Sequence, residues 1–332
     1  MRTRKTVIHL QMLCAILMVS SIAYAQNPST GAERAYPEKP VRMVVPFPPG
    51  GAIDIVARLI TAKLSESIGV QFIVDNRSGA GGAIGTENVA RSAPDGYSLL
   101  FSSTSPMSVN PHITSNIRYN PITSFTPVAM VGYAPQVLAI HPSLPVQSVS
   151  QLIAMAKAKP GELSYASSGV GTIIHITSEY FAQSAGIHLL HVPYKGAAPA
   201  VIDTISGQVT MLFAAYPSIS AHVKAGKLKA LAVTSPRRLE MAPDLPAIAE
   251  TLPDFESRQW WAVSGPAGMP ERIVAQLNKA VNHALLNADV RKNLAAVGAE
   301  PGGGTPNDLA MYLKNDYEKW GRLIKSIGIQ SQ

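Results

Sequence analysis

Short apolar runs alternate with segments of helical periodicity along most of the chain. Residues 41–47 predict a buried strand, Pro48-Pro49-Gly50-Gly51 predicts a turn, and the spacing of apolar residues from Ile53 to Leu64 predicts a helix. Further strands are predicted at residues 71–74, 97–102, 128–131, 136–140, 163–166, 189–192, 209–214 and 228–234. Further helices are predicted at residues 150–159, 172–185 and 199–206. The alternation is typical of βαβ units, so we expect an α/β fold with mostly parallel sheets.

The C-terminal part of the chain is more helical. Pro270 suits the first position of a helix whose apolar face continues to Leu285, and a final helix is expected between Asn307 and Ile327. With 332 residues, 46% of them hydrophobic, the chain is long enough for one large or two medium domains with cores of their own.

The first 25 residues have the three parts of a secretory signal. Residues 2–5 carry three cations, residues 7–19 are mostly apolar, and Ala23-Tyr24-Ala25 fits a cleavage site. We predict cleavage after Ala25 and export of the remainder. Cys14, the only cysteine, lies inside this segment, so the mature protein is held by its core and not by disulfides.

The charge distribution disfavours a nucleic-acid partner. Loss of the three leader cations takes the formal net charge from +7 to +4, and the remaining cations are scattered without an interleaved aromatic stripe. A mild positive excess is compatible with a small anionic ligand.

The sequence lacks the common signatures of catalysis and cofactor binding. Residues 79–85 resemble a dinucleotide loop, but Ile84 stands where the third glycine is needed. No GxxxxGK[ST], GxSxG, SxxK or HExxH pattern occurs. His188 and His191 are close in sequence but have no flanking ligands, which favours a structural role. We therefore expect no catalytic residues, no metal and no cofactor.

Two glycine-bearing turns, at residues 47–54 and 166–175, each follow a predicted strand and lead into a helix. A helix N-terminus offers unpaired N–H groups and partial positive charge, and open α/β sheets bind ligands at the carboxyl ends of their strands. Together the turns predict a site for a small acid. A purely structural interpretation also remains: Thr172 as a helix cap, His175 as a core residue and Asp54 as a dipole partner.

At these turns the sequence resembles the Bug-type receptors, the extracytoplasmic solute-binding proteins of tripartite tricarboxylate transporters. The resemblance covers residues 36 to 328, and its motifs keep the order of the family. They are Tyr36–Arg42, Val45–Gly51, Asp75–Arg77, Ala93–Tyr97, Phe125–Val128, Gly171-Thr172 with His175, His191–Gly196, Gly207–Val209 and Pro266–Gly268.

The resemblance implies a type II periplasmic-binding-protein fold, in which two α/β lobes close over a ligand like a Venus flytrap. Lobe one would comprise residues 36–131 and 258–332, and lobe two residues 132–257, with the ligand cleft between them. Carried over by position, the family's carboxylate loops imply a binding site formed by Phe47, Pro49, Gly50, Gly51 and Asp54 of lobe one and Ser167, Ser168, Gly171, Thr172 and His175 of lobe two. Ser102, Ser103 and Thr104 at a strand end, where capping explains their hydroxyls equally well, and Tyr216 after another strand extend this set.

The function expected from the resemblance is a periplasmic receptor that captures a small carboxylate and performs no covalent chemistry. The ligand would be a dicarboxylate, an amino acid or an aromatic acid, since no arginine cluster suits a tricarboxylate. Delivery would be to the large and small membrane subunits of a transporter, or the loaded receptor would signal through a sensor kinase. A third interpretation is an exported hydrolase that uses His175 with a nearby serine. We expect a monomer.

Overall fold

The computed structural model describes residues 36–332 except 240–241, 297 and 329–332. The chain divides into residues 1–38 and 39–332, and the second unit carries every helix and strand described below. The predicted signal segment and its cleavage point at Ala25 lie outside the described residues. Among those residues, no helix combines the length and the apolar character needed to cross a membrane.

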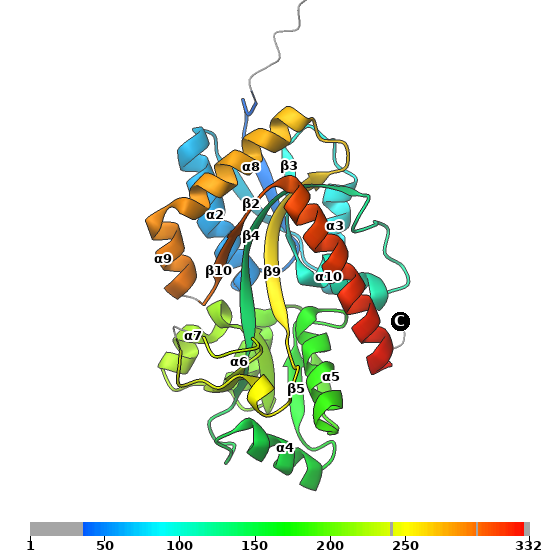
Figure 1. The fold of residues 1–332 in the computed structure, drawn as a ribbon, viewed down its shortest axis with the longest axis vertical. Helices are drawn as coiled ribbons and strands as arrows, with labels where there is room; N and C mark the ends of the chain where they lie inside the picture. Colours follow the sequence, from blue (N-terminus) through cyan, green and yellow to red (C-terminus); the bar gives the residue numbers. More distant parts are fainter. Residues whose placement is uncertain (1–35, 240–241, 297, 329–332) are drawn as a thin grey trace, which may run out of the picture. The chain divides into compact units, whose positions relative to one another are not determined.

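Ten strands form a sheet with two halves that share the long strand β4 (Phe125–Ile140). The first half contains β1 (Val41–Val45), β2 (Phe72–Asn76), β3 (Ser98–Ser103), β9 (Arg258–Pro266) and β10 (Glu300–Gly303) beside the first part of β4. The second half contains β5 (Ser164–Ser167), β6 (Leu190–Pro193), β7 (Met211–Ala215) and β8 (Lys229–Val233) beside its last part. Figure 1 shows β4 running through both halves, with β9 alongside it.

The outer strands of both halves pair in parallel. Parallel pairing joins β1 to β2 and β3, and β5 to β6 and β7. Every antiparallel pairing between the strands named above involves β4 or β9, the strands that return the chain between the halves. The predicted α/β fold is therefore confirmed, and the lobe boundaries stay a prediction.

Nine α-helices connect the strands described here. They are α2 (Ala52–Ile68), α3 (Ala83–Ala90), α4 (Val149–Ala158), α5 (Ile173–Ala185), α6 (Ala197–Ile205), α7 (Tyr216–Lys224), α8 (Glu271–Leu286), α9 (Ala288–Ala296) and α10 (Pro306–Ile327). Short helical turns lie at η1 (Ala80–Gly82), η2 (Ser105–Val109), η3 (Asn110–His112) and η4 (Ile248–Glu250).

Strand alternation in the second half builds two separate cores. Leu138 and Ile140 of β4 pack in the cluster that α4 and α5 cover, whereas Val137 and Ala139 pack in the cluster under α6 and α7. Successive side chains of a strand point to opposite faces, so a strand with helices on both sides is apolar throughout. This explains why β4 has no polar face here.

Helix α10 contributes to the cores of both halves. Its first turns place Leu309 and Leu313 against Leu100 and Trp260 of the first half. Its last turns bury Trp320 and Ile324 in a cluster formed mainly by the second half. The red helix in Figure 1 therefore buries apolar surface of both halves, an arrangement not expected from the sequence.

Two details of the strand prediction were wrong. Residues 128–131 and 136–140 were expected as separate strands, but both belong to β4, which also contains Gly132 and Pro135. The long antiparallel partner β9 keeps the interrupted segment extended, with register shifts near Pro127 and Met130. β9 and β10 were not predicted, although Trp260-Trp261-Ala262-Val263 is an apolar run of the kind found in a buried strand.

Candidate functional site

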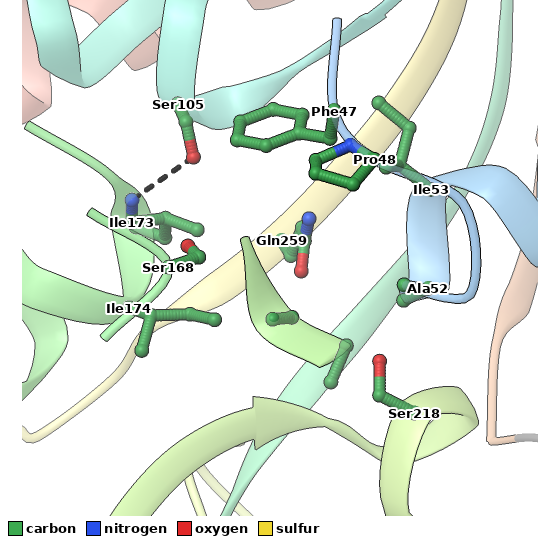
Figure 2. Close-up of a pocket in the computed structure, with 13 residues that line it drawn as sticks. Phe47, Pro48, Ala52, Ile53, Ser105, Ser168, Ile173, Ile174, Ser218 and Gln259 are labelled. Carbon is green, nitrogen blue, oxygen red and sulfur yellow. Dashed lines mark hydrogen bonds between the residues drawn. The ribbon is translucent and has the colours of Figure 1, made fainter. Parts of the chain in front are cut away.

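A small pocket lies where loops of the two halves of the sheet meet (Figure 2). Its free volume is about 30 Å³, room for about two water molecules. The two sides are in near contact, because a Cβ added to Gly51 would lie 3.9 Å from the Cβ of Ala197, and one added to Gly50 would lie 3.8 Å from that of Ala198. A ligand larger than water therefore enters only when the two sides separate.

The first wall of the pocket is the turn between β1 and α2. Phe47, Pro48, Gly51, Ala52 and Ile53 line it. Gly51 caps α2 without a side-chain hydrogen bond. The N–H groups of Ala52 and Ile53, the first two of the helix, have no partner among the described residues. This helix end therefore has donors available to a ligand.

Asp54 shapes this turn and does not line the pocket. Its Oδ2 accepts hydrogen bonds from the Gly50 N–H at 3.1 Å and from Arg58 Nε at 3.0 Å, and its Oδ1 accepts one from Asn76 Nδ2 at 3.0 Å. Burial by itself raises the pKa of Asp54, but the bonds from Arg58, Asn76 and Gly50 outweigh burial and lower the pKa below the usual 3.8. The ionised carboxylate fixes the turn.

The second wall is the loop between β5 and α5, from which Ser168, Ile173 and Ile174 line the pocket. The Ile174 N–H has no partner among the described residues, and the same is true of the Ser168 hydroxyl. Thr172 caps the helix, because its Oγ1 accepts a bond from the His175 N–H at 3.4 Å. The predicted cap is thus observed, and the helix end also has a free donor.

Gly171 gives the second loop its close approach to the first half. Its φ is +75°, and a Cβ there would lie 2.4 Å from Oδ1 of Asn110 in η3. Both the backbone conformation and the contact require glycine. The glycine that the sequence analysis singled out at position 171 is therefore required sterically.

Three stacked rings support the second loop from behind. His175 stacks on His191 with centroids 4.4 Å apart, and His191 stacks on Tyr165 at 4.7 Å. His191 Nε2 lies 2.6 Å from Ser167 Oγ, and His175 Nδ1 accepts a bond from the Gly171 N–H at 3.4 Å. The stack therefore holds the loop at both ends.

Both imidazoles in this stack are held neutral. Burial lowers the pKa of His175 to about 4, with a further contribution from His191, and burial lowers the pKa of His191 to about 4. The Ser167–His191 contact resembles a nucleophile and its base, but Ser167 is fully buried and does not line this pocket. The hydroxyl is therefore placed to fix the loop and not to reach a substrate.

The remaining lining residues come from the ends of other elements. Ser105 opens η2 and accepts a 3.0 Å hydrogen bond from the Ile173 N–H through its Oγ. Ala197 lies at the start of α6, Ala215 and Ser218 lie at the start of α7, and Gln259 lies on β9. Figure 2 shows Gln259 at the centre of the group, between the two walls.

The electrostatic character of the pocket comes from helix ends. The N-termini of α2, α5, α6 and α7 all contribute lining residues. Each carries partial positive charge, which attracts an anion. Among the described residues, none that lines the pocket carries a formal charge. Nor do these residues include a group of three or more metal-ligating side chains.

The predicted site residues fall into three groups. Phe47, Gly51 and Ser168 line the pocket. Those that shape its loops from behind are Gly50, Asp54, Ser167, Gly171, Thr172 and His175, and Pro49 is exposed in the first turn. The third group lies outside the pocket and consists of Ser102, Ser103, Thr104 and Tyr216. The Ser102 hydroxyl donates to the Ala262 carbonyl, and the Thr104 hydroxyl accepts from the Trp260 N–H. The Ser103 hydroxyl is buried without a partner, and Tyr216 packs near Gly298.

The most consequential residues missed are Ser105, Ser218 and Gln259. Ser105 directly follows the predicted hydroxyl run, and Ser218 lies two residues after Tyr216, so both lie next to predicted residues. In both cases a helix begins at the predicted residue: Thr104 precedes η2, and Tyr216 is the first residue of α7. The residues that line the pocket therefore come slightly later in the chain than predicted. Gln259 gave no signal, because its strand was not predicted.

The chain matches known proteins over most of its length. Residues 56–329 match the model of the tripartite tricarboxylate transporter family receptor. The chain is 38% identical to the protein BugT of Bordetella pertussis over 295 residues, which cover 88% of this chain and 90% of BugT.

Solved structures agree in fold. Rpa4515 of R. palustris, solved with adipate, has a TM-score of 0.88 and 37% identity, with 90% of this chain and 100% of that chain covered. MatC from Rhodopseudomonas palustris, solved with bound malate, has a TM-score of 0.83 and 30% identity, with 87% and 100% covered.

These matches decide between the interpretations of the sequence. The hydrolase interpretation was wrong, because the matched family consists of solute-binding receptors and not of enzymes. The predicted resemblance to Bug-type receptors and the periplasmic-binding-protein fold are confirmed. The chain belongs to the tripartite tricarboxylate transporter family of solute-binding receptors.

Proposed function

We propose that this receptor captures a small carboxylate in the pocket between the two halves of the sheet and delivers it to the membrane subunits of a tripartite transporter. The periplasm is the proposed site of action, with the predicted signal segment directing export. The lobe boundaries and the monomeric state expected from the sequence belong to the same proposal, as does a sensor kinase as the alternative partner.

The observation that carries this proposal is the set of free donors around an uncharged pocket. The N–H groups of Ala52, Ile53 and Ile174 and the hydroxyls of Ser168 and Ser218 have no partner among the described residues. Buried polar groups in folded proteins are nearly always hydrogen-bonded, so free donors gathered at helix N-termini suit an acceptor that is negatively charged. Relatives solved with adipate and malate support a carboxylate.

Closure of the two walls over the ligand follows from the same geometry. The free donors come from α2 on one side and α5 and α7 on the other. An anion contacts both sets only when the walls approach each other, so binding stabilises the closed arrangement.

A thermal-shift screen of residues 26–332 tests the proposal. The protein is unfolded and refolded to remove carried-over ligand, then mixed with monocarboxylates, dicarboxylates, amino acids and aromatic acids. A ligand at a hundred times its dissociation constant stabilises by about 2.7 kcal/mol and raises the midpoint by several degrees. Folded protein with no response to any acid would refute carboxylate capture.

A pair of serine variants assigns binding to this pocket. Ser168→Ala removes a free hydroxyl and should weaken the bound acid about tenfold. Ser206→Ala is the matched control, because that hydroxyl donates to the Asp203 carbonyl at the exposed C-terminal end of α6. Equal affinity of the two variants would place the ligand elsewhere.

A further inference from the structure

Gln259 is a buried amide that faces the pocket without a partner. Its exposed fraction is 9%, and its side chain makes no hydrogen bond to any described residue. Figure 2 shows its amide in the middle of the lining residues, with Pro48 and Phe47 above it and Ser168 to one side. Neither amide atom is among the fully buried unpartnered atoms of the described residues, so the amide is open to the pocket and available to a group that the protein itself does not supply.

Gln136 on the adjacent strand β4 provides an internal comparison. It is also buried, but its Nε2 donates to Thr177 Oγ1 at 2.8 Å and to Ser257 Oγ at 3.2 Å. That amide ties β4 to its neighbours. Two glutamines on neighbouring strands therefore differ: the Nε2 of Gln136 is paired within the protein while its Oε1 is buried without a partner, whereas both ends of the Gln259 amide are open towards the pocket.

The surroundings of Gln259 indicate which ligand group it meets. Side chains around it in the pocket are apolar or neutral, including Phe47, Pro48, Ile173 and Ser105, and none is a cation. A second carboxylate buried here would lose its hydration without a positive side chain in return. An amide also has two different ends: its NH₂ donates and its carbonyl accepts.

A ligand group that both donates and accepts satisfies the whole amide. A hydroxyl or a carboxamide accepts from the NH₂ and donates to the carbonyl, whereas a carboxylate satisfies the NH₂ alone and repels the carbonyl oxygen. We propose that this receptor selects acids with one carboxylate and a neutral hydrogen-bonding group, and that Gln259 recognises that neutral group. The inference rests on the proposed function, because the helix ends must first hold the carboxylate.

Matched ligands test the inference by isothermal titration calorimetry. Each set keeps one skeleton and changes the far group: hexanoate, 6-hydroxyhexanoate, the monoamide of adipic acid and adipate; and benzoate, 4-hydroxybenzoate and terephthalate. In the set that binds most tightly, the hydroxy or amide acid should bind about tenfold tighter than the diacid. A diacid that binds tightest in that set would overturn the proposal.

Substitutions assign the preference to the side chain. Gln259→Leu should weaken the hydroxy or amide acid about tenfold and leave the simple monoacid within about twofold. Gln259→Lys should reverse the order in favour of the diacid. Gln136→Leu is the matched control, expected to lower stability and to leave the order of affinities unchanged.

The outcomes separate the two proposals. If folded protein binds no acid of either set or of the wider screen, the proposed function fails. If acids bind but Gln259→Leu weakens every member of a set equally, or none, the proposed role of Gln259 fails and carboxylate capture stands. Circular dichroism and the unfolding midpoint of each variant confirm that it is folded.

Discussion

Ser105 Oγ accepts a 3.0 Å hydrogen bond from the Ile173 N–H, across the pocket and across 68 residues of sequence. Ser105 follows β3 in the first half of the sheet, and Ile173 is the first residue of α5 in the second half. The bond uses one N–H of the α5 terminus and leaves the next, that of Ile174, free. The bond thus joins η2 of the first half to the second wall of the pocket, and the helix end still offers a donor.

Loss of this bond should favour the open arrangement. Ser105→Ala leaves the Ile173 N–H without its acceptor, so we expect the free energy of unfolding to fall by about 1 kcal/mol and the unliganded protein to expand. Urea unfolding measures the first effect, and small-angle scattering measures the radius of gyration. An unchanged scattering curve together with unchanged stability would contradict the role of Ser105.

Asp54 should stabilise the protein in a pH-dependent way. Its pKa is lowered in the folded state, so its contribution is present above the unfolded pKa and is lost as the pH falls through the folded pKa. Asp54→Asn should cost about 1–3 kcal/mol at pH 7, and the cost should shrink as the pH falls below about 3.8. Urea unfolding across pH 3–7 provides the measurement.

The matched control for Asp54 is Glu66→Gln. Glu66 pairs with Lys63 at 2.7 Å on the surface, with 70% of its side chain exposed. An exposed pair of this kind contributes little to stability. A cost for Asp54→Asn no larger than that for Glu66→Gln would show that the turn does not depend on the carboxylate.

The stacked imidazoles should make the fold sensitive to acid. The pKa of His175 and that of His191 are both lowered to about 4, so below pH ~6.5 the unfolded chain takes up protons that the folded chain refuses. Stability should therefore fall between pH ~6.5 and ~4, by up to about 3 kcal/mol for each imidazole, and change little through these groups below that range. NMR titration of the imidazole protons measures both pKa values.

Substitution distinguishes the stack from other histidines. His191→Gln should flatten the dependence of stability on pH, and His222→Gln, at the end of α7 and outside the stack, is the comparison variant. His191→Gln should also weaken ligand binding, because Ser167 loses its imidazole partner. A stability profile in His191→Gln that matches the unsubstituted protein would exclude the stack as the acid-sensitive element.

Gly171 should tolerate no side chain, because a Cβ would clash with Asn110, and this clash can be measured separately from backbone strain. Gly171→Ala places a Cβ 2.4 Å from Asn110 Oδ1 at a φ of +75°. Gly186→Ala, at the other end of α5, has a φ of +60° with nothing within 4 Å. Strain is common to both, so we expect Gly171→Ala to cost at least about 1 kcal/mol more, and to reduce binding.

Denaturant unfolding compares the two glycine variants directly. Asn110→Ala should rescue part of the loss in Gly171→Ala, because it removes the atom that the new Cβ meets. Equal costs for both glycine positions would show that backbone strain alone accounts for the loss.

The alternation of apolar residues was sufficient to predict the α/β class, because strands and helices bury their faces with different periods. The glycine turns, the Thr172 cap and the motif order were also local properties. They located the loops at residues 47–54 and 166–175, and the comparisons confirm the family that these motifs indicated. What could be predicted therefore depended on near neighbours in the chain.

Contacts between distant segments decided the rest. Asp54, Thr172 and His175 have the right residue types for binding, but their side chains are used to hold the loops. Gln259 and Ser105 line the pocket because β9 pairs with β4 and because η2 turns towards α5. A side chain's partner depends on which segments the fold brings together, and a single sequence records the residue types but not that pairing.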